Sequence, residues 1–188
     1  MRTLALIGCG RISHKHIEAA VKNADRLKLV ACCDPRLDRA EAKAAEYRKA
    51  FPDAKVAVYA DYREMLEKER PDICAIATES GYHPRISTDC SEAGSHVICE
   101  KPMALSTSDA DAMIGAARKA GRLLSVCFQN RFNAPVRRTR AALEAGRFGR
   151  VLHGMVQVRW NRNEAYYAEA PWRGTWDLDG GTLMNQCT

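Results

Sequence analysis

Two glycines near the N-terminus have the spacing of a turn that binds phosphate groups. Gly8 and Gly10 begin the segment Gly8–Ser13, which has the pattern G-x-G-x-x-S. In such turns the first glycine allows a tight turn, and the second lets the backbone approach a pyrophosphate. A helix beginning here would point the backbone N–H groups of Arg11 and Ile12 at the phosphates, because a helix start carries a positive partial charge. The pattern therefore predicts dinucleotide binding.

A carboxylate follows the next apolar segment and extends this pattern. Asp34 comes directly after Leu27–Cys33, where its side chain can accept hydrogen bonds from both hydroxyl groups of an adenosine ribose. It would repel the 2′-phosphate of NADP, whereas the nearby Arg36 favours that phosphate. We expect NAD in preference to NADP, with both side chains at the cofactor. In the alternative interpretation, the glycines only form a turn and Asp34 only caps a helix.

A second candidate site is the sequence Glu100-Lys101-Pro102, which follows an apolar segment beginning at His96. Charged residues at the carboxyl end of a parallel strand face the ligand crevice of an α/β sheet. A lysine there can polarise a carbonyl group, or relay the proton that leaves a hydroxyl group as its hydride departs. The alternative is an exposed ion pair without a catalytic role.

The elements that would position these residues alternate between strands and helices. The expected strands are Thr3–Ile7, Leu27–Cys33, Val56–Tyr59, Asp72–Thr78, His96–Glu100 and Leu123–Phe128. The expected helices are Arg11–Asn23, Leu37–Ala50, Tyr62–Glu69, Pro84–Ala93 and Ser106–Ala120, with Asp61 and Ser106 as N-terminal caps. Alternation of this kind requires parallel pairing through crossover helices. It predicts an α/β fold with a Rossmann-type, doubly wound parallel sheet.

The pattern changes after Phe128. We expect a helix over Ala134–Glu144, a long strand over Val151–Trp160 that begins a second sheet, an irregular segment to Asp179, and a helix over Thr182–Thr188. The predicted domains are residues 1–125, which bind NAD(P), and residues 126–188, an incomplete domain for substrate binding and oligomerisation.

Composition excludes several classes of protein. Apolar residues make up 46% of the 188 residues, so a packed core is feasible. No apolar run approaches the roughly 20 residues that span a bilayer, and the N-terminal run is short for a signal peptide. We therefore expect a cytoplasmic protein without a membrane partner. None of the eight cysteines forms a C-x-x-C pair, which predicts reduced core thiols and no metal site.

The chain carries a net charge of +6, and arginines cluster between Arg137 and Arg150. This charge suits an anionic ligand such as a dinucleotide or a nucleotide-sugar. A nucleic-acid-binding patch is the competing interpretation. We favour a solvated helix face, because few aromatic residues interleave with the arginines, and we expect no nucleic-acid partner.

Together, Gly8–Ser13, Asp34, the loop Thr78–His83 and Glu100-Lys101-Pro102 resemble the Gfo/Idh/MocA family of oxidoreductases. The resemblance implies an N-terminal Rossmann domain and a C-terminal α/β domain with an open, largely antiparallel sheet. It also implies NAD(P)-dependent oxidation of a sugar or cyclitol hydroxyl. Its cofactor-binding residues would include Thr78, His83, Glu100, Lys101 and Gln129, with Lys101 catalytic. Family members form oligomers through this sheet, so a homo-oligomer (a dimer or tetramer) is implied where the second domain is complete.

The segment Trp172–Gln186 resembles a narrower group, the UDP-N-acetylglucosamine and UDP-N-acetylglucosaminuronic acid 3-dehydrogenases. This resemblance implies oxidation of the C3 hydroxyl of a nucleotide-sugar. The substrate would contact Lys101, Arg131, Trp172, Arg173 and Asn185, and Asn185 would share the catalytic role with Lys101. The tryptophans are equally compatible with a small hydrophobic cluster.

The family pattern Gly-Gly-x-Leu-x-Asp/Asn-x-x-x-His places Asn185 at its Asp/Asn position, so its histidine would follow Thr188. We therefore expect a C-terminally truncated chain. Two functional hypotheses follow: an NAD-dependent dehydrogenase, and a catalytically incomplete module or fragment that binds NAD without turnover.

Overall fold

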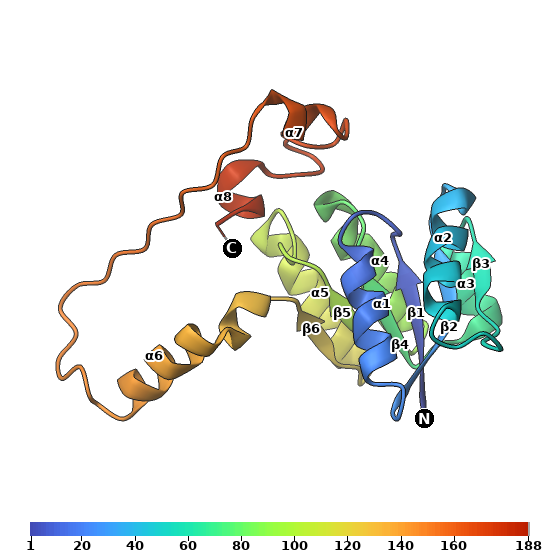
Figure 1. The fold of residues 1–188 in the computed structure, drawn as a ribbon, viewed down its shortest axis with the longest axis horizontal. Coiled ribbons are helices and arrows are strands. Elements are labelled where there is room, and N and C mark those ends of the chain that lie inside the picture. The colour runs from blue at the N-terminus through green and yellow to red at the C-terminus, as the bar shows by residue number, and fades with distance from the viewer. Residues whose placement is uncertain (188) are drawn as a thin grey trace.

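The chain folds around a parallel sheet of six strands (Figure 1), and the computed structural model describes residues 1–187. The strands are β1 (Arg2–Ile7), β2 (Leu27–Cys33), β3 (Ala57–Tyr59), β4 (Ile73–Ile76), β5 (His96–Cys99) and β6 (Leu124–Val126). Their order across the sheet is β3-β2-β1-β4-β5-β6, and every neighbouring pair is parallel. The predicted Rossmann-type sheet is confirmed.

Helices cover both faces of this sheet, because successive side chains of a strand point to opposite sides. The helices are α1 (Ser13–Lys22), α2 (Leu37–Arg48), α3 (Tyr62–Glu69), α4 (His83–Glu92) and α5 (Thr107–Lys119). In β1, Leu4 and Leu6 share a core cluster with residues of α1 and α2, such as Ile17. Ala5 and Ile7 share the opposite cluster with residues of α3, α4 and α5, such as Met65.

Local signals in the sequence set the helix boundaries. The Asp61 side chain accepts a hydrogen bond from Arg63 N at the start of α3, and Ser106 accepts one from Asp109 N at the start of α5. Such caps satisfy backbone donors that the first helical turn leaves free. Six of the eight cysteines are buried and all eight are free thiols, as predicted for a reduced core.

The strand order reverses beside β1, and ligands bind at such a reversal outside the carboxyl ends of the strands. β1 ends against β4 here, and the two backbones approach closely. Gly8 has a φ of +88°, and a Cβ at this position would lie 2.6 Å from the carbonyl carbon of Ala77. Only glycine fits this contact, which brings the first turn next to the end of β4.

Residues after β6 form helices and extended chain. The short 3-10 helix η2 (Gln129–Phe132) leads into α6 (Ala134–Glu144), and α7 (Glu164–Ala168) and α8 (Gly181–Asn185) follow an extended segment. Figure 1 shows α6 and this extended segment projecting from the sheet, while α7 and α8 return to the carboxyl ends of the strands. The helix α6 lies where it was predicted. The α8 prediction is confirmed over Gly181–Asn185, and Thr188 lies outside the described residues.

The predicted strand over Val151–Trp160 is wrong. Within residues 1–187 this segment has no strand partner, and each of its residues is exposed. A strand needs a neighbour to accept and donate its backbone hydrogen bonds, and none lies beside this segment. The second, largely antiparallel sheet is therefore not present in the described part of the chain, and α7 is a helix where an irregular segment was expected.

Within residues 1–187, no helix has the length and apolar character needed to cross a membrane.

Candidate active site

A cavity of about 870 Å³ lies between the carboxyl ends of the strands and the returning segment that carries α7 and α8. Most of the predicted site residues line it. They come from both parts of the chain: Gly8, Gly10, Arg11, Ile12, Asp34, Thr78, Glu100, Lys101, Gln129, Arg131, Trp172, Arg173 and Asn185. The volume is within the range of small-molecule sites.

The glycine-containing turn forms one end of this cavity. Gly8 N donates to Cys33 O over 2.8 Å, and Ser13 Oγ donates to Gly10 O over 2.5 Å. Ser13 is fully buried, so its small side chain lets α1 pack closely on the sheet. A Cβ at Gly10 would meet no protein atom within 4 Å. The space in front of Gly10 is therefore open to a ligand.

Asp34 connects the end of β2 to this turn. Its Oδ2 accepts a hydrogen bond from Cys9 N and its Oδ1 accepts one from Arg36 N, both over 2.9 Å. The residue is 7% exposed and lines the cavity. The carboxylate is thus held by two backbone donors, and its remaining lone pairs can accept hydroxyl groups.

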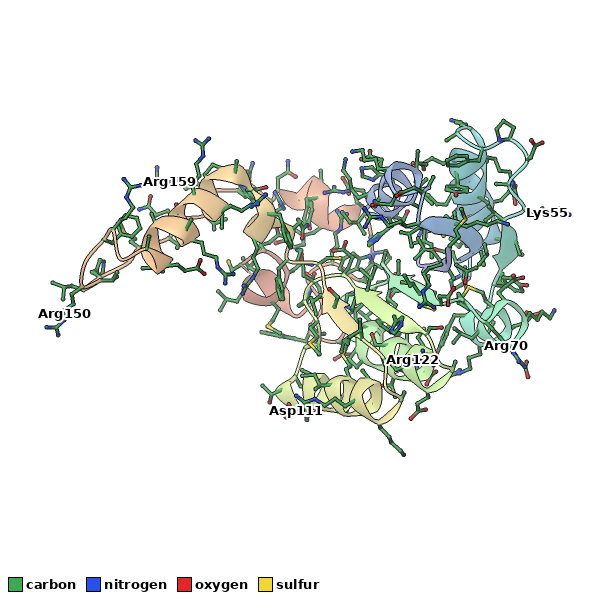
Figure 2. The ribbon with its side chains drawn as sticks, turned by 90° about the horizontal axis from the view of Figure 1, so that it is seen from below. Lys55, Arg70, Asp111, Arg122, Arg150 and Arg159 are labelled. Atoms are coloured by element: carbon green, nitrogen blue, oxygen red, sulfur yellow. The ribbon has the colours of Figure 1, made fainter. Side chains whose placement is uncertain are left out.

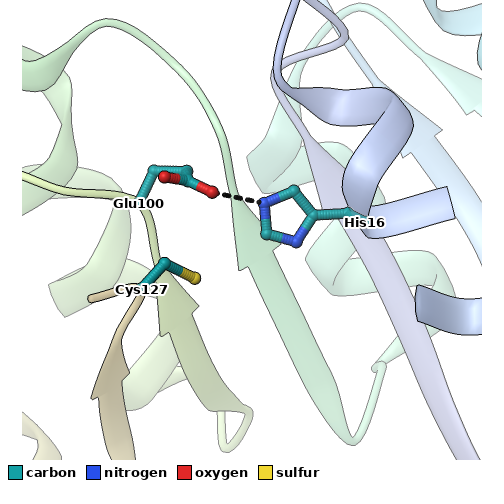
Figure 3. Close-up of side chains that lie close together, drawn as sticks. All are labelled: His16, Glu100 and Cys127. Carbon is teal, nitrogen blue, oxygen red and sulfur yellow. Dashed lines mark hydrogen bonds and ion pairs between the residues drawn. The ribbon is translucent and has the colours of Figure 1, made fainter. Parts of the chain in front are cut away.

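Glu100 lies at the end of β5 and contacts α1 (Figure 3). His16 Nε2 donates to Glu100 Oε1 over 3.1 Å, and both side chains are nearly buried. The Cys127 thiol lies close to both, with the ligand atoms of all three residues within 4.8 Å of one another. Burial of the thiol raises the pKa of Cys127 to about 12, and the negative charge of the nearby Glu100 acts in the same direction to a smaller extent. The thiol therefore stays protonated, and His16 and Glu100 already satisfy each other without a cation.

Lys101 reaches across the cavity to α8. Its Nζ donates to the backbone carbonyl oxygen of Asn185. Asp179 is 4% exposed and accepts hydrogen bonds from Asn185 Nδ2 and from Gly174 N. Burial lowers the pKa of Lys101, although the carboxylates of Glu100 and Asp179 act in the opposite direction. A lysine with a lowered pKa can take up and release protons more readily near neutral pH.

Two predicted cofactor residues do not line the cavity. Arg36 lies on the surface at the start of α2, where its Nη2 pairs with Asp38 Oδ2 at 2.9 Å. His83 begins α4 and is 1% exposed. Its ring nitrogens lie 2.8 Å from Pro102 O and 3.2 Å from Thr78 O, and burial lowers its pKa. His83 therefore lies outside the cavity, on its buried side, and links the loop at Thr78 to the loop at Pro102.

Several lining residues were missed from the sequence. Arg39 lies at the Asp34 end, and the other end includes Trp160, Arg162, Tyr166 and Gln186. The arginines and aromatic residues stand close together in sequence around α7. That aromatic-rich composition was the only available signal, because an irregular segment has no periodicity from which to infer which side chains face inward.

The residues present fit a dinucleotide cofactor. The turn offers open space at Gly10 for a diphosphate, and the buried Asp34 carboxylate lies beside it for a ribose. Glu100 and Lys101 lie further along the same cavity.

Comparison with protein families gives two matches. The family model described as an oxidoreductase family with an NAD-binding Rossmann fold matches residues 2–128. The model of the GFO/IDH/MocA C-terminal domain matches residues 136–188. Among curated proteins, D-glucoside 3-dehydrogenase of Escherichia coli is 32% identical over 148 residues, covering 79% of this chain and 40% of that protein. D-apiose dehydrogenase of Paraburkholderia graminis is 34% identical, covering 82% and 40%.

Two solved structures resemble this chain closely. The WlbA dehydrogenase of Bordetella pertussis, in complex with NADH and UDP-GlcNAcA, has a TM-score of 0.92 and 39% identity, covering 100% of this chain and 54% of that one. The WlbA dehydrogenase of Chromobacterium violaceum, with the same ligands, has a TM-score of 0.92 and 41% identity, covering 99% and 52%. The chain thus spans between 40% and 54% of the length of these relatives.

Proposed function

The chain belongs to the Gfo/Idh/MocA oxidoreductase family and has its NAD-binding Rossmann domain, and from this premise we propose that it is part of a dehydrogenase that oxidises the C3 hydroxyl group of a nucleotide-sugar. The single observation that carries the proposal is the cavity in which the glycine turn, Asp34, Lys101 and Asn185 meet. The similarity to the two WlbA structures supports the nucleotide-sugar and the C3 position.

Each end of the cavity has a different role in this proposal. The start of α1 binds the diphosphate, with Arg11 and Ile12 supplying backbone N–H groups, and Asp34 binds the adenosine ribose. Glu100, held by His16, binds the nicotinamide ribose. Because Asp34 is negative and buried, we propose NAD in preference to NADP. Bound NAD⁺ supplies the acceptor for the hydride.

The substrate end is built around Lys101. We assign to its Nζ the contact with the hydroxyl group that loses its proton, because burial lowers its pKa and the group faces the cavity. Asn185, fixed by Asp179, holds Lys101 through its carbonyl oxygen and so sets the position of the ammonium group. Gln129, Arg131, Trp172 and Arg173 complete the proposed substrate wall.

The reaction is tested by mixing the protein with NAD⁺ and UDP-GlcNAcA and following NADH absorbance. We expect NADH to form, and Lys101→Ala to remove at least about 99% of the rate, since a general acid or base contributes on the order of 10²-fold or more. Lys119→Ala is the matched control, because Lys119 is an exposed residue at the end of α5. If the wild-type protein binds NADH but does not reduce NAD⁺, the chain is an NAD-binding module without turnover.

We also propose that the whole protein is a homo-oligomer. Support comes from apolar side chains that stand free on the extended segment, such as Leu152 at 82% exposed and Val156 at 89%. Apolar patches of this kind mark association surfaces. Light scattering after size exclusion tests the proposal, and a monomer at all concentrations would contradict it.

A further inference from the structure

Two arginines enclose one tyrosine in the wall of the cavity. Arg162 precedes α7 and Arg173 follows it, and their guanidinium carbons lie 4.9 Å and 4.1 Å from the centre of the Tyr166 ring. Trp160 lies under Arg162 at 5.1 Å, and Trp172 lies under Arg173 at 5.8 Å. Stacking on aromatic rings holds guanidinium groups in place and stabilises them. The arrangement therefore keeps two cations at the cavity wall.

Each of these guanidinium groups keeps one buried donor without an acceptor. Within the described residues, Arg162 Nε and Arg173 Nε are buried and have no hydrogen-bond partner, and the Arg173 side chain is 8% exposed. Other donors of these groups bond within the chain: Arg162 Nη2 donates to Gln186 Oε1 over 2.9 Å, and Arg173 Nη1 donates to Glu169 Oε2 over 2.6 Å. A buried donor left unpaired is costly, so an acceptor from outside the chain would relieve both.

Positive charge exceeds negative charge around Arg162 and Arg173, which favours binding of an anion. In the described part of the chain, Glu169 is the carboxylate that pairs with Arg173, and its side chain is 54% exposed, whereas Arg162 forms no ion pair with a carboxylate. The same Oε2 also lies 3.7 Å from Arg11 Nη1. One partly solvated carboxylate is thus shared between Arg11 and Arg173. The surplus positive charge would attract a ligand group with oxygen atoms and negative charge.

The pair lies near the reacting group. Arg162 contacts Gln186, which is adjacent in sequence to Asn185, the partner of Lys101. Gln186 Nε2 also donates to the Tyr166 hydroxyl group over 3.2 Å. These contacts connect the arginine pair to the substrate end of the cavity, whereas the cofactor's diphosphate has its own site at the start of α1.

We propose that Arg162 and Arg173 form a subsite for an anionic group of the substrate, so that the substrate is a sugar derivative carrying a carboxylate or a phosphate. This inference rests on the proposed function and adds the chemical class that the far wall of the cavity selects. A planar guanidinium group pairs with either anion through two parallel hydrogen bonds, so the shared chemistry is an oxyanion within reach of both side chains.

The test measures binding by calorimetry to the full 188-residue chain saturated with NADH. Three probes distinguish the sources of the anion: UDP-GlcNAcA, which has a carboxylate and a diphosphate; UDP-GlcNAc, which has only the diphosphate; and glucuronate, which has only the carboxylate. The variants are Arg162→Gln and the charge-conserving Arg162→Lys. Arg159→Gln is the matched control, since Arg159 lies three residues away on the projecting segment, away from the sheet (Figure 2).

We expect Arg162→Gln to weaken UDP-GlcNAcA binding on the order of 10- to 100-fold, the usual effect of losing a charged hydrogen bond. Arg162→Lys should retain part of the affinity, and Arg159→Gln all of it. If the anion is a carboxylate, Arg162→Gln should also bind glucuronate more weakly and should bind UDP-GlcNAc as the wild type does. If the anion is the diphosphate, the variant should bind UDP-GlcNAc more weakly and glucuronate as the wild type does. NADH affinity should stay unchanged in every variant.

Two results would overturn the subsite alone: wild-type affinity of Arg162→Gln for UDP-GlcNAcA, or a loss of NADH affinity in Arg162→Gln that assigns the pair to the cofactor. In either case wild-type protein still binds the nucleotide-sugars, so the proposed function stands. Wild-type protein that binds NADH but none of the three probes overturns the subsite and the proposed substrate class together.

Discussion

The two regions of this molecule differ in how far they bury their apolar side chains. Residues 1–128 bury their apolar side chains on both faces of a sheet, and Leu6, Leu29 and Met65 are fully buried. Residues 129–187 expose theirs, as at Val156, and bury little apart from Asp179. Strand pairing gives the first region a core of its own, while the second region is ordered mainly by its contacts around the cavity.

Among the described residues, hydrogen bonds and an ion pair between residues distant in sequence join the two regions at three places. Gly81 N donates to Leu178 O over 3.3 Å, and a Cβ at Gly81 would lie 2.0 Å from Asp177 O. Lys101 Nζ donates to Asn185 O. The third place is the ion pair between Arg11 and Glu169. The end of the cavity proposed for the cofactor is therefore built by the region that contains the apolar core, and the end proposed for the substrate depends on how the second region packs against it.

The largest difference between the regions is expected for truncated apolar side chains. Leu6→Ala should lower the free energy of unfolding by about 2–5 kcal/mol, because the side chain is fully buried and leaves a cavity. Val156→Ala, at a position 89% exposed, should change it by less than about 0.5 kcal/mol. Urea unfolding followed by circular dichroism measures both. Equal losses would show that Val156 belongs to a packed core in the second region.

The cofactor end should respond strongly to loss of one charge. Asp34→Asn keeps the size of the side chain but weakens its bonds to the ribose and to Cys9 N, so NADH affinity should fall roughly tenfold. The ratio of NADPH to NADH affinity should rise, because the repulsion of a 2′-phosphate is removed. Asp38→Asn is the control, since Asp38 is exposed and pairs with Arg36 outside the cavity. Titrations of wild type and variants with NADH and NADPH measure both affinities. An unchanged ratio of NADPH to NADH affinity in Asp34→Asn would show that Asp34 does not contact the cofactor.

The sequence was most informative where local rules and packing agree. The six strands, the five helices between them and the cap at Asp61 follow from periodicity and capping residues, because a two-sided sheet imposes continuous apolar strands. Most proposed site residues line one cavity, since carboxyl ends of parallel strands meet at one edge.

Predictions failed where no local rule decides. Val151–Trp160 has the alternation of a strand, but alternation cannot supply the neighbour that a strand requires. The contact of Arg36 with the cofactor stays a prediction, since in the structure its guanidinium group pairs with Asp38 on the surface, outside the cavity. Arg162 was missed because only the three-dimensional return of the chain brings it beside Tyr166.

Helix caps allow a smaller matched comparison. Ser106→Ala removes the cap of α5 in the first region and should cost about 1 kcal/mol of global stability. Asn163→Ala removes the equivalent cap of α7, where Asn163 accepts from Tyr166 N over 3.1 Å. We expect that change to speed hydrogen exchange of the α7 amides without moving the global transition. A global loss from Asn163→Ala would mean that both regions unfold as one unit.

The smallest expected effect is on the pH dependence of stability. Burial holds the pKa of His83 below its usual 6.5, so the unfolded chain binds more protons as pH falls below 6.5. Stability should therefore decrease on acidification below that value and stay constant above it. His83→Gln should flatten this dependence, while His153→Gln, on the exposed segment, should leave it unchanged. Parallel pH profiles of wild type and His83→Gln would refute the assignment.

The most direct test of the account is calorimetric titration of NADH into the wild-type chain, Gly10→Ala and Gly115→Ala. Neither added Cβ meets a protein atom within 4 Å, so both variants should fold. We predict saturable binding at one site in the wild type and in Gly115→Ala, and at least roughly tenfold weaker binding in Gly10→Ala, whose methyl group occupies the space proposed for the diphosphate. Folded wild-type protein that does not bind NADH, or equal affinity in Gly10→Ala, would contradict it.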